Sequence, residues 1–94
     1  MTTIFSIEDE EALVSLLEYN ITSAGYKFEH SSNGYDGMIK IQKTNPDLIL
    51  LDWMLPDISG TEICKFIRSN KNLKKTPIIM LTAKGEENDL LAGF

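Results

Sequence analysis

The sequence has one cysteine, few positive charges and no long apolar run. The lone Cys64 has no partner for an internal disulfide, so we expect a protein of the reducing cytoplasm. Nine Lys and Arg residues against fourteen Asp and Glu leave a net charge of −5. This balance argues against nucleic-acid binding by this segment, because such binding needs a cationic face. The longest apolar runs, such as Leu48–Leu51, are far shorter than the ~18–20 residues that span a membrane. The segment Met1–Phe5 lacks the features of a signal peptide.

The residues that are present suffice for one small domain. The chain has 94 residues, of which 43% are hydrophobic, which is ordinary for a globular protein and too high for a disordered one. No internal repeat, low-complexity segment or Pro/Gly-rich linker divides it. We therefore expect residues 1–94 to belong to a single domain.

Short apolar runs alternate with stretches of helical periodicity along the chain. The runs predicted as strands are Thr3–Ile7, Tyr26–Ser31, Leu48–Leu51 and Ile78–Leu81. The stretches predicted as helices are Asp9–Ala24, Tyr35–Thr44, Gly60–Asn70 and Glu86–Phe94. This alternation predicts an α/β fold with a parallel sheet and helices on both faces. Leu48–Leu51 is typical of a central strand buried on both faces, whereas Tyr26–Ser31 has fewer aliphatics and is expected nearer an edge.

The first predicted helix has a candidate cap and a candidate inner face. Asp9 is expected to cap its N-terminus, and Gly25 to end it. Its inner face is predicted to carry Leu13, Leu16, Leu17, Ile21 and Ala24.

Acidic side chains follow two of the predicted strands. Glu8 and Asp9 follow the first strand, and Asp52 follows the third. Ligands of open parallel sheets bind beyond the carboxyl ends of the strands. If the first, third and fourth strands are neighbours, we expect these carboxylates and the hydroxyl of Thr82 to meet in one crevice. The mutual repulsion of the carboxylates should raise their pKa values, and a Mg²⁺ ion would relieve it. We predict that Glu8, Asp9 and Asp52 hold the metal together with the backbone carbonyl of Met54.

This arrangement permits phosphoryl transfer to a carboxylate. Asp52 is the candidate nucleophile, because an aspartate can form an acyl phosphate. The metal would neutralise phosphoryl oxygens and help to align the reacting atoms. Thr82, directly after the fourth strand, could donate a hydrogen bond to a phosphoryl oxygen, and the small Ala83 would leave the approach open.

Three motifs together resemble the receiver domain of bacterial two-component response regulators. They are Glu8-Asp9, the segment Asp52–Gly60 and the segment Leu81–Lys84, each at a predicted strand end. The resemblance covers all 94 residues. It implies a flavodoxin-like doubly wound sheet, Mg²⁺ binding, phosphorylation of Asp52 by a sensor histidine kinase, and Thr82 as the switch hydroxyl. Glu8 in place of the commoner aspartate is similar to the subfamily of transcription regulators in which a winged-helix DNA-binding domain follows the receiver.

The chain departs from this family at its C-terminal end. Family members continue through a fifth strand and a fifth helix, and that strand ends in a lysine that pairs with the acyl phosphate. Only four βα units fit into this sequence, so residues 1–94 are predicted to be a C-terminally incomplete receiver domain. Lys84 is not assigned the role of the missing lysine. We expect a further tail, a partner chain or strand exchange within a homodimer to cover the vacant position.

Two other functions stay open at this point. A phosphorylation-independent interaction module on the same fold is favoured slightly by the missing lysine, and it need not bind Mg²⁺ together with beryllofluoride. A phosphatase that forms an aspartyl phosphate is a weaker alternative. Such enzymes carry a second aspartate two residues after the nucleophile, where this chain has Met54. The receiver hypothesis makes the chain a phosphorylated switch more than an enzyme.

Other polar and small residues are assigned structural roles. His30 is expected at the surface, with no ligand role. Cys64 is expected to be a small packing residue beside the apolar face of its helix. Asp57 is expected to be a turn or cap residue in the loop after the third strand.

Trp53, next to the proposed acceptor, should report on metal binding. We predict that Mg²⁺ changes its fluorescence, because the ring adjoins the carboxylate that binds the ion. A titration to millimolar Mg²⁺ measures this directly. An unchanged signal in a folded sample would count heavily against the metal site.

Overall fold

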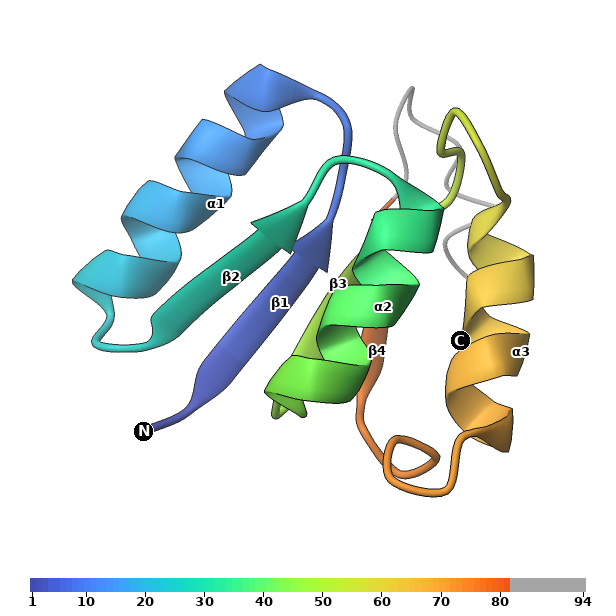
Figure 1. Ribbon diagram of the computed structural model, residues 1–94. Coiled ribbons are helices and arrows are strands. Elements are labelled where there is room, and N and C mark those ends of the chain that lie inside the picture. Colours follow the sequence, from blue (N-terminus) through green and yellow to red (C-terminus); the bar gives the residue numbers. More distant parts are fainter. Residues whose placement is uncertain (82–94) are drawn as a thin grey trace.

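Four parallel strands form a single sheet in the order β2-β1-β3-β4. The strands are β1 (Thr3–Ile7), β2 (Lys27–Ser31), β3 (Leu48–Asp52) and β4 (Ile78–Leu81). The helices between them are α1 (Glu11–Ser23), α2 (Gly34–Thr44) and α3 (Gly60–Ser69) (Figure 1). The computed structural model describes residues 1–81, so the predicted helix Glu86–Phe94 lies outside the described residues.

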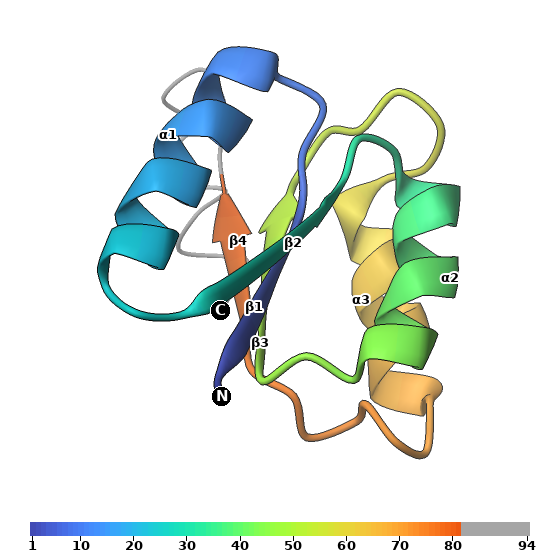
Figure 2. The same cartoon turned by 60° about the vertical axis from the view of Figure 1, so that its left-hand side comes forward.

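The helices lie on both faces of the sheet, as the β-α alternation predicted. Helix α1 covers one face, and α2 and α3 cover the other (Figure 2). Strand β3 lies between β1 and β4, and its residues Ile49, Leu50 and Leu51 are buried. This confirms the central position expected for the aliphatic run. Strand β2 lies at an end of the strand order, as its poorer apolar content indicated.

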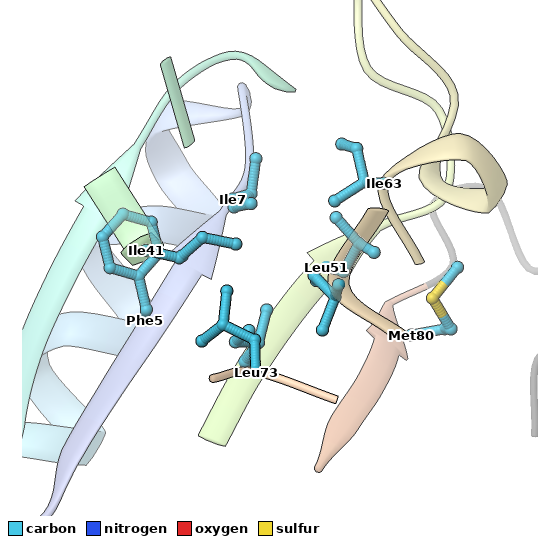
Figure 3. Packing of buried hydrophobic residues seen from close by; sticks show 9 residues of the cluster. Phe5, Ile7, Ile41, Leu51, Ile63, Leu73 and Met80 are labelled. Atoms are coloured by element: carbon cyan, nitrogen blue, oxygen red, sulfur yellow. The ribbon is translucent and has the colours of Figure 1, made fainter. Parts of the chain in front are cut away.

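The main apolar core fills the space between the sheet and helices α2 and α3 (Figure 3). Side chains alternate between the faces of a strand, so Phe5 and Ile7 of β1 point to this side. The other buried members are Ile41, Ile49, Leu51, Ile63, Ile67, Leu73 and Met80. The half-buried Cys64 packs against this cluster, with its sulfur 3.6 Å from that of Met80, which confirms its packing role.

Helix α1 differs from its prediction at the N-terminus and on its inner face. It begins at Glu11 rather than at Asp9, and the residue before it, Glu10, makes no side-chain cap. Asp9 therefore does not cap the helix, and the chain is still in the loop at that point. The predictions for Leu16 and Ala24 were also wrong, since Leu16 is 59% exposed and Ala24, at the C-cap, is exposed as well.

The inward stripe of α1 is set by the helical repeat. Leu13, Leu17 and Ile21, at successive intervals of four residues, are half-buried. Val14 is half-buried beside them and completes the stripe, which leaves Leu16 on the flank. Beyond the helix, Gly25 has a positive φ of 93° and its N–H bonds to the carbonyl of Thr22, which confirms it as the residue that ends α1.

Helix α2 packs closely on β1 because it carries glycine at the contact. A Cβ atom on the buried Gly37 would lie 2.7 Å from Cδ1 of Ile7 and 2.9 Å from its Cγ1. Ile7 is itself fully buried in the core cluster, so it can yield only by displacing other core side chains.

We therefore predict that Gly37→Ala destabilises the protein. The overpacking against Ile7 should cost about 1–3 kcal/mol, more than the ~1 kcal/mol that alanine gains over glycine in helix propensity. Urea denaturation measures the difference, with the exposed Gln42→Ala on the same helix as the control. A Gly37→Ala variant as stable as the wild type would contradict the close packing.

Candidate functional site

Three carboxylates meet at the carboxyl end of the sheet. Ile7 of β1 pairs with Leu51 of β3, so the residues that follow them in register are Glu8 and Asp52. One carboxylate oxygen from each of Glu8, Asp9 and Asp52 lies within 4.8 Å of the others. The loops after β1, β2 and β3 also lie together at this end of the sheet (Figure 1). The structure thus brings together the three acidic residues that the sequence placed in one crevice.

Two of these carboxylates are almost inaccessible to solvent. Glu8 and Asp52 are each 2% exposed, whereas Asp9 is exposed. The N–H of Glu10 donates to Oε2 of Glu8 at 3.0 Å, and the N–H of Met54 donates to Oδ1 of Asp52 at 3.2 Å. Each buried carboxylate is therefore oriented by a backbone donor two residues further along its own loop.

Burial and mutual repulsion disfavour the charged forms of this cluster. Desolvation is the main cause that raises the pKa of Glu8 from 4.5 to about 7, and the charges of Asp52 and Asp9 add to it. Desolvation and the neighbouring Asp9 likewise raise the pKa of Asp52, against the opposing bond from Met54. The ion pairs found within residues 1–81 join other side chains and do not neutralise the cluster.

The donor set fits a hard divalent cation. All three side chains offer carboxylate oxygens, the ligands that Mg²⁺ prefers, and a cation would offset the repulsion that raises the pKa values. Glu8, Asp9 and Asp52 would hold such an ion. The part assigned to the carbonyl of Met54 stays a prediction. Thr82 and Lys84 lie outside the described residues.

Strand β2 supports the main chain of Glu8 through Ser31 and His30, and the part played by His30 was not predicted. The N–H of Glu8 donates to the carbonyl of Ser31 at 3.0 Å. Nε2 of His30 lies 3.2 Å from the carbonyl oxygen of Glu8, and its ring stacks on Phe28. A carbonyl oxygen only accepts, so Nε2 carries the proton in this contact. His30 is thus half-buried beside the acidic cluster and not the surface residue that was expected. No sequence signal could have revealed this contact, because it follows from the β1–β2 register, in which His30 pairs with Ser6.

The loop after β3 closes on itself and contacts α2. The N–H of Gly60 donates to the carbonyl of Trp53 at 2.9 Å, and Met54 forms an isolated antiparallel bridge with Ser59. Asp57, at the tip, accepts hydrogen bonds from the first two backbone N–H groups of α2. Asp57 was predicted as a turn or cap residue of its own loop. It caps α2 instead, a helix that begins more than 20 residues earlier in the chain.

The raised pKa of Glu8 predicts a pH-dependent cost to the metal-free protein. The folded state binds the Glu8 proton more tightly than the unfolded state does, and this tighter binding stabilises the fold. The stabilisation is fully present below about pH 4.5 and is lost as the pH rises through about 7. Glu8→Gln is neutral throughout, so in a chelator it should be the more stable protein at pH 8, by up to about 3 kcal/mol. At pH 5 the two proteins should differ little.

Urea denaturation at both pH values measures this difference. Glu11→Gln, at an exposed acidic position nearby, is the matched control and should show no such change. A Glu8→Gln variant that is less stable than the wild type at pH 8 in chelator would contradict the cost of burial and repulsion that raises the pKa of Glu8.

Among the helices of residues 1–81, none combines the length and the apolar character that a bilayer crossing requires.

The fold is shared with solved structures of response regulators. CheY4 of Vibrio cholerae superposes with a TM-score of 0.89 at 28% identity, over 99% of this chain and 78% of that one. The Mn²⁺-bound form of response regulator Rcp1 superposes with a TM-score of 0.83 at 29% identity, over 98% of this chain and 73% of that one. These matches confirm the flavodoxin-like fold.

The sequence is similar to transcription regulators along nearly its whole length. It is 45% identical over 88 residues to the phosphate regulon transcriptional regulatory protein PhoB of Rhizobium meliloti, covering 94% of this chain and 39% of the relative. It is 44% identical over 91 residues to the alkaline phosphatase synthesis transcriptional regulatory protein PhoP of Bacillus subtilis, covering 97% of this chain and 37% of that relative. The chain thus spans less than two-fifths of the length of these two relatives. The family model of the response regulator receiver domain matches residues 4–94, and the chain belongs to this family.

Proposed function

We propose that Asp52 is the phosphoacceptor of this receiver domain and that a sensor histidine kinase is its donor. The observation that carries the proposal is the position of Asp52. Its buried carboxylate lies at the end of the central strand β3, within 4.8 Å of the carboxylates of Glu8 and Asp9. The Mn²⁺-bound structure of the response regulator Rcp1 supports a divalent cation in a protein of this fold.

In the proposed transfer, a carboxylate oxygen of Asp52 attacks the phosphorus of a phosphohistidine. The new P–O bond forms as the P–N bond breaks, and the imidazole nitrogen keeps the electron pair. Mg²⁺, when bound, would neutralise charge on the phosphoryl oxygens. Glu8 and Asp9 would hold the ion, and the Met54 N–H would orient the Asp52 carboxylate.

The phosphorylated domain then acts as a switch more than as an enzyme. The modification adds a charge of about −1.5 to −2 beside the acidic cluster. We propose that Thr82, the residue after β4, senses the phosphoryl group and that the populations of two surface conformations shift. We propose that a DNA-binding domain downstream in a longer parent protein would receive the signal. The names of PhoB and PhoP, both transcriptional regulatory proteins, support a role in transcription. A cytoplasmic location and dimer formation are part of the same proposal.

Replacing Asp52 should abolish phosphorylation. We predict that a small acyl-phosphate donor with Mg²⁺ adds one phosphoryl group to the wild type and none to Asp52→Ala, measured by intact mass. Asp47→Ala is the matched control. Its carboxylate bonds to the N–H of Thr3 at the opposite end of the sheet, so labelling should persist.

Two outcomes would contradict the proposal. Stoichiometric labelling of Asp52→Ala would place the acceptor elsewhere. A folded wild type that is neither labelled nor able to bind Mg²⁺ together with beryllofluoride would instead support a phosphorylation-independent interaction module.

A further inference from the structure

The tip of the β3–α3 loop is fastened to a distant helix through Asp57. The N–H of Gly34 donates to Oδ1 of Asp57 at 2.8 Å, and the N–H of Tyr35 donates to Oδ2 at 2.9 Å. Both carboxylate oxygens are engaged, and both donors belong to the first turn of α2. The contact therefore joins two segments that lie 22 and 23 residues apart in the sequence.

Asp57 completes the hydrogen bonding of the α2 N-terminus. The first four N–H groups of a helix have no partner within it. In α2 the side chain of Asn33 accepts from the N–H of Asp36, whereas the N–H groups of Gly34 and Tyr35 donate to Asp57. Desolvation opposes the charged form of Asp57, but these bonds outweigh it and lower the pKa of the carboxyl group. Half of the helix start thus depends on a residue of another loop.

The same loop carries the backbone that touches the acceptor. Met54 donates to Asp52 and pairs with Ser59, so Asp57 lies inside the short segment that this bridge closes. Next to Asp57, Ile58 packs so closely on α2 that a Cβ at Gly34 would clash with its Cγ2. Apolar contacts of this kind are non-directional. The two hydrogen bonds of Asp57, in contrast, set the orientation of the loop tip against donors that are fixed in a helix.

We propose that Asp57 is a positioning residue of the metal site: by anchoring the β3–α3 loop to the start of α2, it holds the main chain of Met54 in place beside Asp52. The loss of this anchor would let the loop tip move and would misplace the oxygen donors around the ion. The inference rests on the proposed function, because it concerns the Mg²⁺ affinity of that same site.

The test compares two variants that remove caps from the same helix. Asp57→Ala removes the anchor in the loop, whereas Asn33→Ala removes the local cap and leaves the loop bonds intact. Both should lower the melting temperature. Only Asp57→Ala should weaken Mg²⁺ binding, by about tenfold, the size of effect seen when groups that orient metal ligands are removed. Isothermal titration with Mg²⁺, well below the melting temperature of each variant, measures the affinity.

A third variant separates position from charge. Asp57→Asn removes the same negative charge as Asp57→Ala but keeps one acceptor oxygen for the α2 donors. We expect its Mg²⁺ affinity to lie between those of the wild type and Asp57→Ala. An affinity of Asp57→Asn as low as that of Asp57→Ala would assign the effect to long-range charge and overturn the inference.

The remaining outcomes are equally decisive. Wild-type Mg²⁺ affinity in Asp57→Ala, with a lowered melting temperature, would make Asp57 a structural cap only and would leave the proposed function standing. If Asp57→Ala does not fold, Asp57→Asn is compared with the wild type at high salt, which screens long-range charge. An Mg²⁺ affinity that is still weakened there supports the inference, and an unchanged affinity overturns it. A wild type that binds no Mg²⁺ would overturn the proposed function and the inference with it.

Discussion

The site depends on the parallel pairing of β1 with β3. This register places Glu8 and Asp52 side by side at the carboxyl ends of two adjacent strands. Both side chains are nearly excluded from water, and this burial is the main cause that raises the pKa of each. The neighbouring charge of Asp9 adds to the rise in both. The apolar core beneath them, built by Phe5, Ile7 and Leu51 among others, contributes the free energy that keeps like charges together. A divalent cation, as proposed, would convert this unfavourable arrangement into a binding site.

The loops that carry the carboxylates are held from outside their own strands. Strand β2 contacts the main chain of Glu8 through Ser31 and His30. Helix α2 holds the tip of the β3–α3 loop through Asp57. The acidic cluster is therefore supported by elements that contribute no carboxylate to it. Such supporting contacts matter because a metal site needs its ligands within a narrow range of positions.

Much of the architecture followed from short-range sequence patterns. The run Leu48–Leu51 was predicted as a central strand because four successive aliphatics suit burial on both faces. Gly25 ends α1 because only a residue that tolerates positive φ suits that position. The same patterns were ambiguous in α1, where four aliphatic residues from Leu13 to Leu17 permit more than one inward face. Packing against the sheet half-buries Val14 and leaves Leu16 exposed. This packing is a tertiary contact, so the local pattern could not decide between the two residues.

The sequence by itself determined which residues end each strand, and hence that Glu8, Asp9 and Asp52 lie at one edge of a parallel sheet. This is a consequence of chain direction, because all strands of such a sheet present their carboxyl ends together. Tertiary structure alone decided how that edge is supported. The contact of His30 with Glu8 depends on the β1–β2 register, and the cap that Asp57 supplies depends on where α2 docks. Contacts of this kind join residues more than 20 positions apart, and no local propensity encodes them.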